Sequence, residues 1–297
     1  MDASQISARD SLLLTIDLRL MLWIIGLYVL SCVAHIGQAC VSAFCKNLTM
    51  GRIATWLLYA AAISHTGLTV LRWVEEGKPP FQNKYECLSW FAWSNVLTYI
   101  YVQRRWRRVS FPGVFVTVLS IAAMFIALHK YDPAVVPLAP ALQSKWYIWH
   151  VLIAFFSYAV FVVGCSIELS YLFMRLSNWL GKSWEYFGLP ASEVEPFHRL
   201  TFKLILVGFP LLTFGIGSGA AWADEAWGRY WSWDPFEILT LITWTAFALY
   251  LHAMAVPKWR NVLGSVFNVL GFACMIVTFM GSGWLTRLFG LYSMHAY

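Results

Sequence analysis

Charge is scarce in this chain. Only 12% of its 297 residues are charged, whereas 60% are hydrophobic, and the mean hydropathy is +0.62. Soluble domains usually contain about 25% charged residues, so this composition excludes a water-soluble globular protein. The apolar residues gather into blocks of about 20 residues, which is the length that a helix needs to cross a bilayer. The sequence therefore predicts a polytopic membrane protein.

Several chemical signatures are also missing. The six cysteines form no CxxC or CxxCH motif, which excludes a dithiol redox carrier and a c-type cytochrome. The sequence shows no Ser/His/Asp or Cys/His catalytic set and no Gly-rich phosphate loop. The net charge of +6 comes from basic residues between apolar blocks, which favours a membrane-orientation signal over nucleic-acid binding. The N-terminal residues predict no cleaved signal peptide.

Eight apolar blocks predict eight membrane-spanning helices, because a helix satisfies every backbone amide inside lipid. The predicted spans are 21–43, 53–73, 88–103, 111–128, 146–174, 201–220, 236–256 and 262–284. We therefore expect an all-α polytopic membrane protein in which residues 1–297 form a single integral membrane domain. The basic run 104–108 predicts that its loop faces the cytoplasm or the organellar equivalent, with both termini on the other side.

A dense aromatic segment follows the sixth span, in a loop predicted to be extracytoplasmic. Its sequence, WADEAWGRYWSWDPFE, covers residues 222–237 and includes Trp222, Trp227, Tyr230, Trp231, Trp233 and Asp234. An interfacial aromatic belt is the alternative, but a belt needs no tight run that ends at Asp-Pro. The run predicts a flat, π-rich surface with indole N–H donors at its edge. Such a surface suits a planar ligand that carries carboxylates, and haem has this shape.

The segment resembles the tryptophan-rich WWD signature of haem-handling proteins, and the stretch around it is similar to the CcsA/ResC type of System II cytochrome c biogenesis. A second stretch, 65–93, also resembles that family. The matching residues are Arg72, Trp73, Gly77, Pro80, Asn83, Tyr85 and Glu86, whereas Lys78 replaces the usual His and Cys87 the usual Ser. The resemblance implies that 222–237 is a haem-binding segment. Arg72 and Glu86 could contact haem propionates or a partner, or simply cap helices.

Two histidines are predicted to lie on the same side of the membrane as the Trp segment. His150 stands at the start of the fifth span, and His295 stands in the C-terminal tail. Together they could bind haem iron from its two axial directions. A helix–helix hydrogen bond is the alternative for any histidine within a span. The resemblance implies that these two residues are the axial ligands of an external haem.

A second histidine pair lies deeper in the predicted membrane. His35 and His252 fall at similar depth on two different spans, where they could hold a second, embedded haem. The resemblance supports this pairing, because a transmembrane haem route is proposed for the family. His65 is a reserve ligand, and a packing role is favoured for it. His129 and His198 are placed in loops and receive no role.

The resemblance implies a component of a holocytochrome c synthase, with haem b as its substrate and bound ligand. It would transport haem across the membrane and present it to the CxxCH thiols of an apocytochrome c, together with a CcsB/ResB-type partner. Thiol addition to haem vinyl groups needs positioning and reduced iron rather than an enzyme nucleophile, so we assign no catalytic residue. The expected location is the bacterial inner membrane or the thylakoid membrane, in contact with lipid and not with nucleic acid.

Two other functions stay open at this point. One is a haem chaperone or exporter that delivers haem without lyase activity, as in the CcmC type. The other is a di-haem, cytochrome-b-like subunit of a quinone oxidoreductase, in which the aromatic loop would have no explanation.

Overall fold

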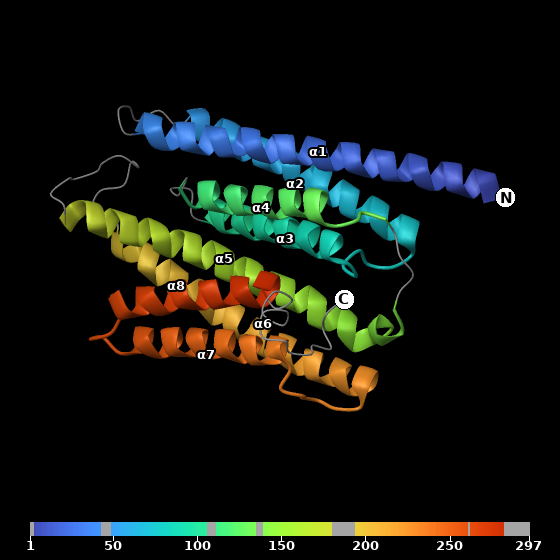
Figure 1. Ribbon diagram of the computed structural model, residues 1–297. Coiled ribbons are helices and arrows are strands. Elements are labelled where there is room, and N and C mark those ends of the chain that lie inside the picture. Colours follow the sequence, from blue (N-terminus) through green and yellow to red (C-terminus); the bar gives the residue numbers. More distant parts are fainter. Residues whose placement is uncertain are drawn as a thin grey trace. The chain divides into compact units, whose positions relative to one another are not determined.

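The structure is a computed structural model that describes residues 3–42, 49–105, 111–134, 139–179, 194–260 and 262–281. Across these ranges the regular structure is entirely helical (Figure 1). The eight α-helices are α1 (Ala3–Ser42), α2 (Thr49–Glu76), α3 (Lys84–Arg105), α4 (Phe111–Lys130), α5 (Lys145–Trp179), α6 (Val194–Trp227), α7 (Pro235–Ala255) and α8 (Val262–Ile276). The short helix η1 (Pro140–Leu142) precedes α5, and the π-helical turn η4 (Val277–Gly281) follows α8. The predicted all-α fold is confirmed.

The helices divide into two compact units, each built from four long helices. The first unit contains α1–α4, in which α1 packs against α2 and α4, and α3 packs against α4. The second contains η1, α5–α8 and η4, with α5 against α6, α7 against α8, and α8 also against α5. Within each unit successive helices run antiparallel (Figure 1). Residues that are far apart in the sequence therefore come together at the same end of the unit.

Seven of the described helices are long and apolar enough to cross a membrane. The exception is α3, for which a short span was predicted. More than half of its residues are buried, including Ser94 and Asn95, which are fully enclosed. Because α2 and α4 cover much of it, this helix does not need an apolar surface on every side. The chain is an integral membrane protein, and α3 is its most polar helix.

A buried ion cluster joins three helices of the first unit at one end. The Arg72 guanidinium on α2 lies 2.5 Å from the Asp17 carboxylate of α1 and 3.4 Å from Glu86 of α3. It also lies 3.3 Å from Glu76 and donates to the Pro133 carbonyl at 3.0 Å. All of these side chains are almost completely shielded from solvent. The cluster therefore places one buried guanidinium among three carboxylates.

We expect Arg72→Met to destabilise the first unit strongly. Removing one partner from a buried ion pair costs about 3–5 kcal/mol, because the remaining charges stay buried without compensation. Arg52→Met is the matched control, since Arg52 lies on the same helix and is exposed. Thermal unfolding in detergent should show a clear loss for Arg72→Met and little change for Arg52→Met. Equal midpoints for the two variants would contradict a structural role for the cluster.

Candidate functional site

The aromatic segment is helical in its first part. Helix α6 continues through Trp222 and ends at Trp227, whereas the sequence predicted a loop from residue 222 onward. Only 228–234 connect α6 to α7. Gly228 has φ +70° and Trp233 has φ +59°, and both values lie in the left-handed region that a non-glycine residue rarely adopts. These two positions reverse the chain within a few residues, so the segment is a helix end followed by a tight turn.

A reciprocal hydrogen-bond pair at the start of α7 holds this turn in place. The Asp234 carboxylate caps the helix by accepting from the Phe236 N–H at 2.8 Å. The Glu237 carboxylate accepts in return from the N–H groups of Asp234 at 3.1 Å and Ser232 at 2.8 Å. This is a capping box with Pro235 at the first helical position. Asp234 is 5% exposed, so its carboxylate is engaged in shaping the turn.

The same device begins α3 in the first unit. Asn83 accepts from the Glu86 N–H at 2.9 Å, and the Glu86 carboxylate accepts from the Asn83 N–H at 3.4 Å. Glu86 also accepts from the Gln82 N–H at 2.7 Å. Of the two roles that the sequence left open for Arg72 and Glu86, the described contacts favour the structural one. Both residues stabilise helix ends from buried positions.

The aromatic rings of the segment do not form the flat surface that was predicted. The rings of Trp222 and Trp227 are tilted by 56°, and those of Trp231 and Trp233 are nearly perpendicular at 85°. The Trp222 indole N–H donates to the Ala141 carbonyl of η1 at 2.6 Å, so it anchors the segment to the chain before α5. Edge-to-face packing of this kind is the preferred arrangement of aromatic pairs. The aromatic rings of the segment are consequently inclined to one another and do not share a plane.

His150 lies against α6 beside the anchored indole. Its Nδ1 lies 2.7 Å from the Gly215 carbonyl oxygen, and a carbonyl only accepts, so Nδ1 carries the proton. Its ring stacks with Trp222 at a centroid distance of 5.9 Å and an interplanar angle of 27°. This contact confirms that the start of α5 and the Trp segment lie at the same end of the second unit. The other ring nitrogen, Nε2, is therefore the one whose lone pair is suited to binding a metal.

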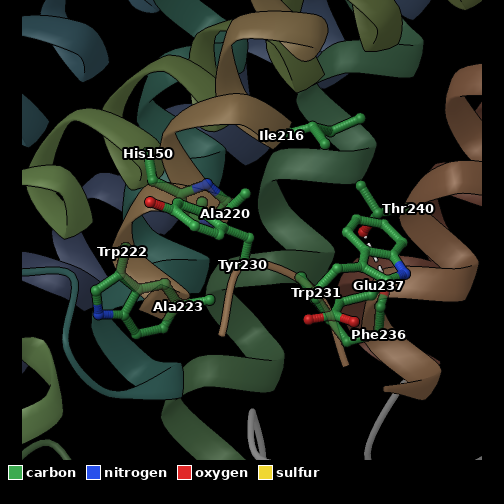
Figure 2. Close-up of a pocket in the computed structure, with 11 residues that line it drawn as sticks. His150, Ile216, Ala220, Trp222, Ala223, Tyr230, Trp231, Phe236, Glu237 and Thr240 are labelled. Carbon is green, nitrogen blue, oxygen red and sulfur yellow. Dashed lines mark hydrogen bonds between the residues drawn. The ribbon is translucent and has the colours of Figure 1, made fainter. Parts of the chain in front are cut away.

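A pocket lies between His150 and the turn. It holds about 370 Å³ of empty space, including the part that opens to solvent. Its lining residues are His150, Ile216, Gly219, Ala220, Trp222, Ala223, Tyr230, Trp231, Phe236, Glu237 and Thr240. Figure 2 shows His150 and Trp222 on one side and Trp231 and Phe236 on the other. Apolar and aromatic walls with a few convergent polar groups are typical of cofactor and substrate sites.

Two of the aromatic residues that line the pocket carry polar groups. The Trp231 indole N–H is buried and makes no hydrogen bond within the described part of the chain, which makes it a donor for a bound ligand. Tyr230 is 62% exposed. A hydrogen bond with the Asp224 carboxylate raises the pKa of the Tyr230 phenol above its ordinary value. Arg229 and Trp233 are exposed residues of the same turn, and Arg229 is a positively charged residue next to Tyr230 in the sequence.

His35 belongs to the first unit and is fully enclosed there. Its Nδ1 donates to the Ser31 carbonyl at 2.8 Å, while Nε2 has no hydrogen bond among the described residues. That arrangement has the tautomer of a metal ligand. The space beside Nε2 is filled, however, because a Cβ at Gly113 of α4 would lie only 2.5 Å from it. A large ligand could reach His35 only if α4 moved away at Gly113.

The remaining histidines have different surroundings. His252 is exposed in the last turn of α7, in the second unit, with its ring 5.9 Å from that of Trp259. His65 is buried between two hydroxyls, with Nδ1 2.9 Å from Tyr28 and Nε2 2.9 Å from Ser89, as its predicted packing role requires. His295 lies outside the described residues.

The loop positions predicted for His129 and His198 are wrong. His129 is in the last turn of α4 and stacks on Phe125 at 3.9 Å. His198 is on α6, fully buried, with Nδ1 2.8 Å from the Glu168 carboxylate and Nε2 on the Arg260 carbonyl. Ser265 of α8 donates to the same carboxylate at 2.5 Å. Sequence reasoning missed this cluster because His198 precedes the apolar block, and the only available signal was Glu168 in the middle of an apolar span.

Comparison with known proteins assigns the chain to a family. Residues 81–289 match the family model described as "Cytochrome C assembly protein". The chain belongs to this family. It is 32% identical to the cytochrome c biogenesis protein CcsA of Guillardia theta over 250 residues, which are 78% of this chain and 82% of the relative. It is 34% identical to CcsA of Synechococcus sp. (strain CC9902) over 263 residues, which are 81% and 85% of the two chains. These relatives make it a CcsA-type member.

A solved structure shares the fold. The chain of the cytochrome c heme lyase CcmF superposes with a TM-score of 0.69 at 15% sequence identity, covering 92% of this chain. The present chain corresponds to 49% of the length of CcmF. The likeness therefore shows a common helical architecture, and the family match covers both the aromatic segment and His150.

The capping role of Asp234 predicts a difference between two substitutions. Asp234→Asn should keep the turn, because Asn is as good an N-cap as Asp, whereas Asp234→Ala should lose about 0.5–2 kcal/mol. Thermal unfolding in detergent and tryptophan fluorescence would measure the effect on stability and on the pocket. If Asn were as damaging as Ala, the negative charge itself would be required, and a direct ligand contact would replace the capping explanation.

Proposed function

We propose that this cytochrome c maturation component binds haem b at the His150 pocket and presents it for covalent attachment to a CxxCH apocytochrome c. The observation that carries this proposal is the position of His150 in an aromatic pocket, where the Gly215 carbonyl holds the proton on Nδ1 and so leaves the lone pair on Nε2. The family membership supports haem handling as the task. His295 supplies the second axial ligand, so that the iron is held by two histidines until the histidine of CxxCH replaces one of them.

In this proposal, different residues contact the porphyrin, bind the propionates and stabilise the pocket walls. Trp231, Phe236 and Tyr230 supply apolar and aromatic contact to the porphyrin, with the angled rings enclosing its edge. The buried Trp231 N–H and the exposed Arg229 are the propionate contacts, because both are suited to a carboxylate. Trp222, Trp227 and Asp234 hold the framework. Asp234 would repel a propionate, which is a further reason to assign it to the turn.

The bond-forming step needs no nucleophile from this chain. Each cysteine thiol of CxxCH adds across one haem vinyl group, forming one C–S bond and one C–H bond without an oxidant. The protein contributes positioning, water exclusion and the retention of reduced iron. A CcsB/ResB-type partner would receive and orient the apocytochrome, and the Trp segment faces the extracytoplasmic side. The complex lies in a bacterial inner membrane or a thylakoid membrane.

In this proposal, His35 and His252 each bind haem on its way to the pocket. The Nδ1–Ser31 hydrogen bond of His35 gives it the ligand tautomer. Because Gly113 lies so close to Nε2, α4 must move before haem can bind His35. In this proposal the haem on His35 is therefore transient and serves transfer rather than storage.

We expect His150→Ala and His295→Ala to remove most of the haem from the protein purified out of membranes. Each substitution deletes one of two axial bonds. The pyridine haemochrome assay measures the content, and it also distinguishes intact vinyl groups from thioethers. His129→Ala is the matched control, because His129 is exposed and contacts only its own helix in the described interactions. Full haem content in both pocket variants would contradict the site.

The transfer route predicts a different pattern for His35→Ala and His252→Ala. Haem content should fall in both variants, and haem should stay undelivered to the pocket even when His150 is intact. Co-expression with the partner and an apocytochrome c should then yield less c-type haemochrome by about tenfold or more. Normal b-type haem without any c-type product in the wild-type complex would favour the chaperone function over the synthase.

A further inference from the structure

A short stretch of α6 behind His150 is built from small residues. Gly215, Gly217 and Gly219 alternate with Ile216 and Ser218, and they differ sharply in how much room each has. A Cβ at Gly219 would lie 2.6 Å from His150 Nδ1 and 2.8 Å from Cε1. A Cβ at Gly217 would meet nothing within 4 Å, and one at Gly215 would only touch Ala154 at 3.8 Å. Of these three glycines, Gly219 is the one position at which an added Cβ would clash with the His150 ring.

The atoms that exclude a Cβ at Gly219 all belong to the His150 ring. The third nearest atom is its Cγ at 3.5 Å, and no backbone of α5 is among the three. The ring can rotate away from an added methyl group, whereas a backbone could not. The absence of a side chain at Gly219 therefore determines where the imidazole lies, more than how closely α5 and α6 pack.

The hydrogen bond to Gly215 fixes the rest of the orientation. The Gly215 carbonyl accepts from His150 Nδ1 at 2.7 Å and from the Ser218 hydroxyl at 3.0 Å. Ser218 also donates to Phe214 at 2.9 Å and is 3% exposed. A carbonyl offers only lone pairs, so the proton must stay on Nδ1. The Gly215 carbonyl thus binds the ring at Nδ1. Gly219, which has no side chain, leaves room for the ring to pack directly against α6.

We propose that Gly219 and the Gly215 carbonyl form a positioning element that sets the tautomer and direction of His150, and so the strength of its bond to a haem iron. Partners that orient a ligating histidine typically change metal affinity by 10–100-fold when they are lost. Gly219 touches the ligand ring rather than the porphyrin, so it acts through His150. This inference rests on the proposed haem site and names the feature of the fold that makes His150 a competent ligand.

The test compares Gly219→Ala with Gly217→Ala in the full-length protein. Gly219→Ala should lower haem affinity by about tenfold or more and shift the ferric spectrum from low spin toward high spin. Imidazole added to the sample should restore the low-spin spectrum, because it supplies the ligand that the displaced ring no longer provides. Gly217→Ala should bind haem like the wild type, and size-exclusion chromatography should show both variants folded.

The outcomes separate this inference from the proposed function. Gly219→Ala that matches Gly217→Ala, while His150→Ala still loses haem, would overturn the positioning role and leave the haem site intact. Haem binding that is unaffected by His150→Ala would instead overturn the haem site itself. Loss of haem in Gly219→Ala that imidazole does not restore would show damage to the pocket beyond the ligand, and it would also overturn the positioning role.

Discussion

The arrangement of the candidate site depends on the reciprocal capping of α7 by Asp234 and Glu237. Glu237 gathers the N–H groups of Ser232 and Asp234, which lie on either side of Trp233 with its left-handed backbone. A residue in that conformation is strained and persists only where its surroundings determine it. The capping box supplies that determination, and it sets the directions in which Trp231 and Trp233 project. The Asp234 carboxylate stabilises the turn outside the pocket lining, while Glu237, the aromatic rings and His150 line the pocket.

Each unit contains such a capping pair and a histidine that packs against a glycine of a neighbouring helix. In the first unit these are Asn83 with Glu86, and His35 against Gly113. In the second they are Asp234 with Glu237, and His150 against Gly219. The difference lies in access, because His150 borders a pocket whereas His35 is fully enclosed. A histidine with a fixed tautomer can be ready for a metal, but the space in front of it decides whether a haem can enter.

Hydropathy was sufficient to predict the helices because lipid allows no other backbone structure on these segments. It could not predict where α5 and α6 end. These helices contain 35 and 34 residues, far more than the roughly 20 that cross a bilayer, so their ends lie in polar sequence. Trp222–Trp227 and His198 were misplaced for this reason, whereas His129 lies in the last turn of α4, just beyond the predicted span. His150 was identified because its position next to an apolar block placed it on the side of the Trp segment.

The predicted depth of a histidine along its span was a poor basis for pairing haem ligands, because depth does not indicate which helices are neighbours. The candidate pair His35 and His252 shares a predicted depth, but one is enclosed and the other exposed, in different units. The flat aromatic surface failed as a prediction because residue composition does not fix the angles between rings, which here follow from the turn and from the Trp222–Ala141 hydrogen bond.

The most direct test of the account is electron paramagnetic resonance of oxidised protein that carries His35→Ala and His252→Ala and is loaded with haem after purification, so that delivery through these two histidines is not needed. The protein is produced with and without ¹⁵N-histidine. Of the four histidines proposed here as haem ligands, this variant keeps only His150 and His295. The account predicts a low-spin ferric signal whose nitrogen couplings change with the isotope. A high-spin signal, or a low-spin signal that is insensitive to labelled histidine, would contradict a histidine-ligated haem at this pocket.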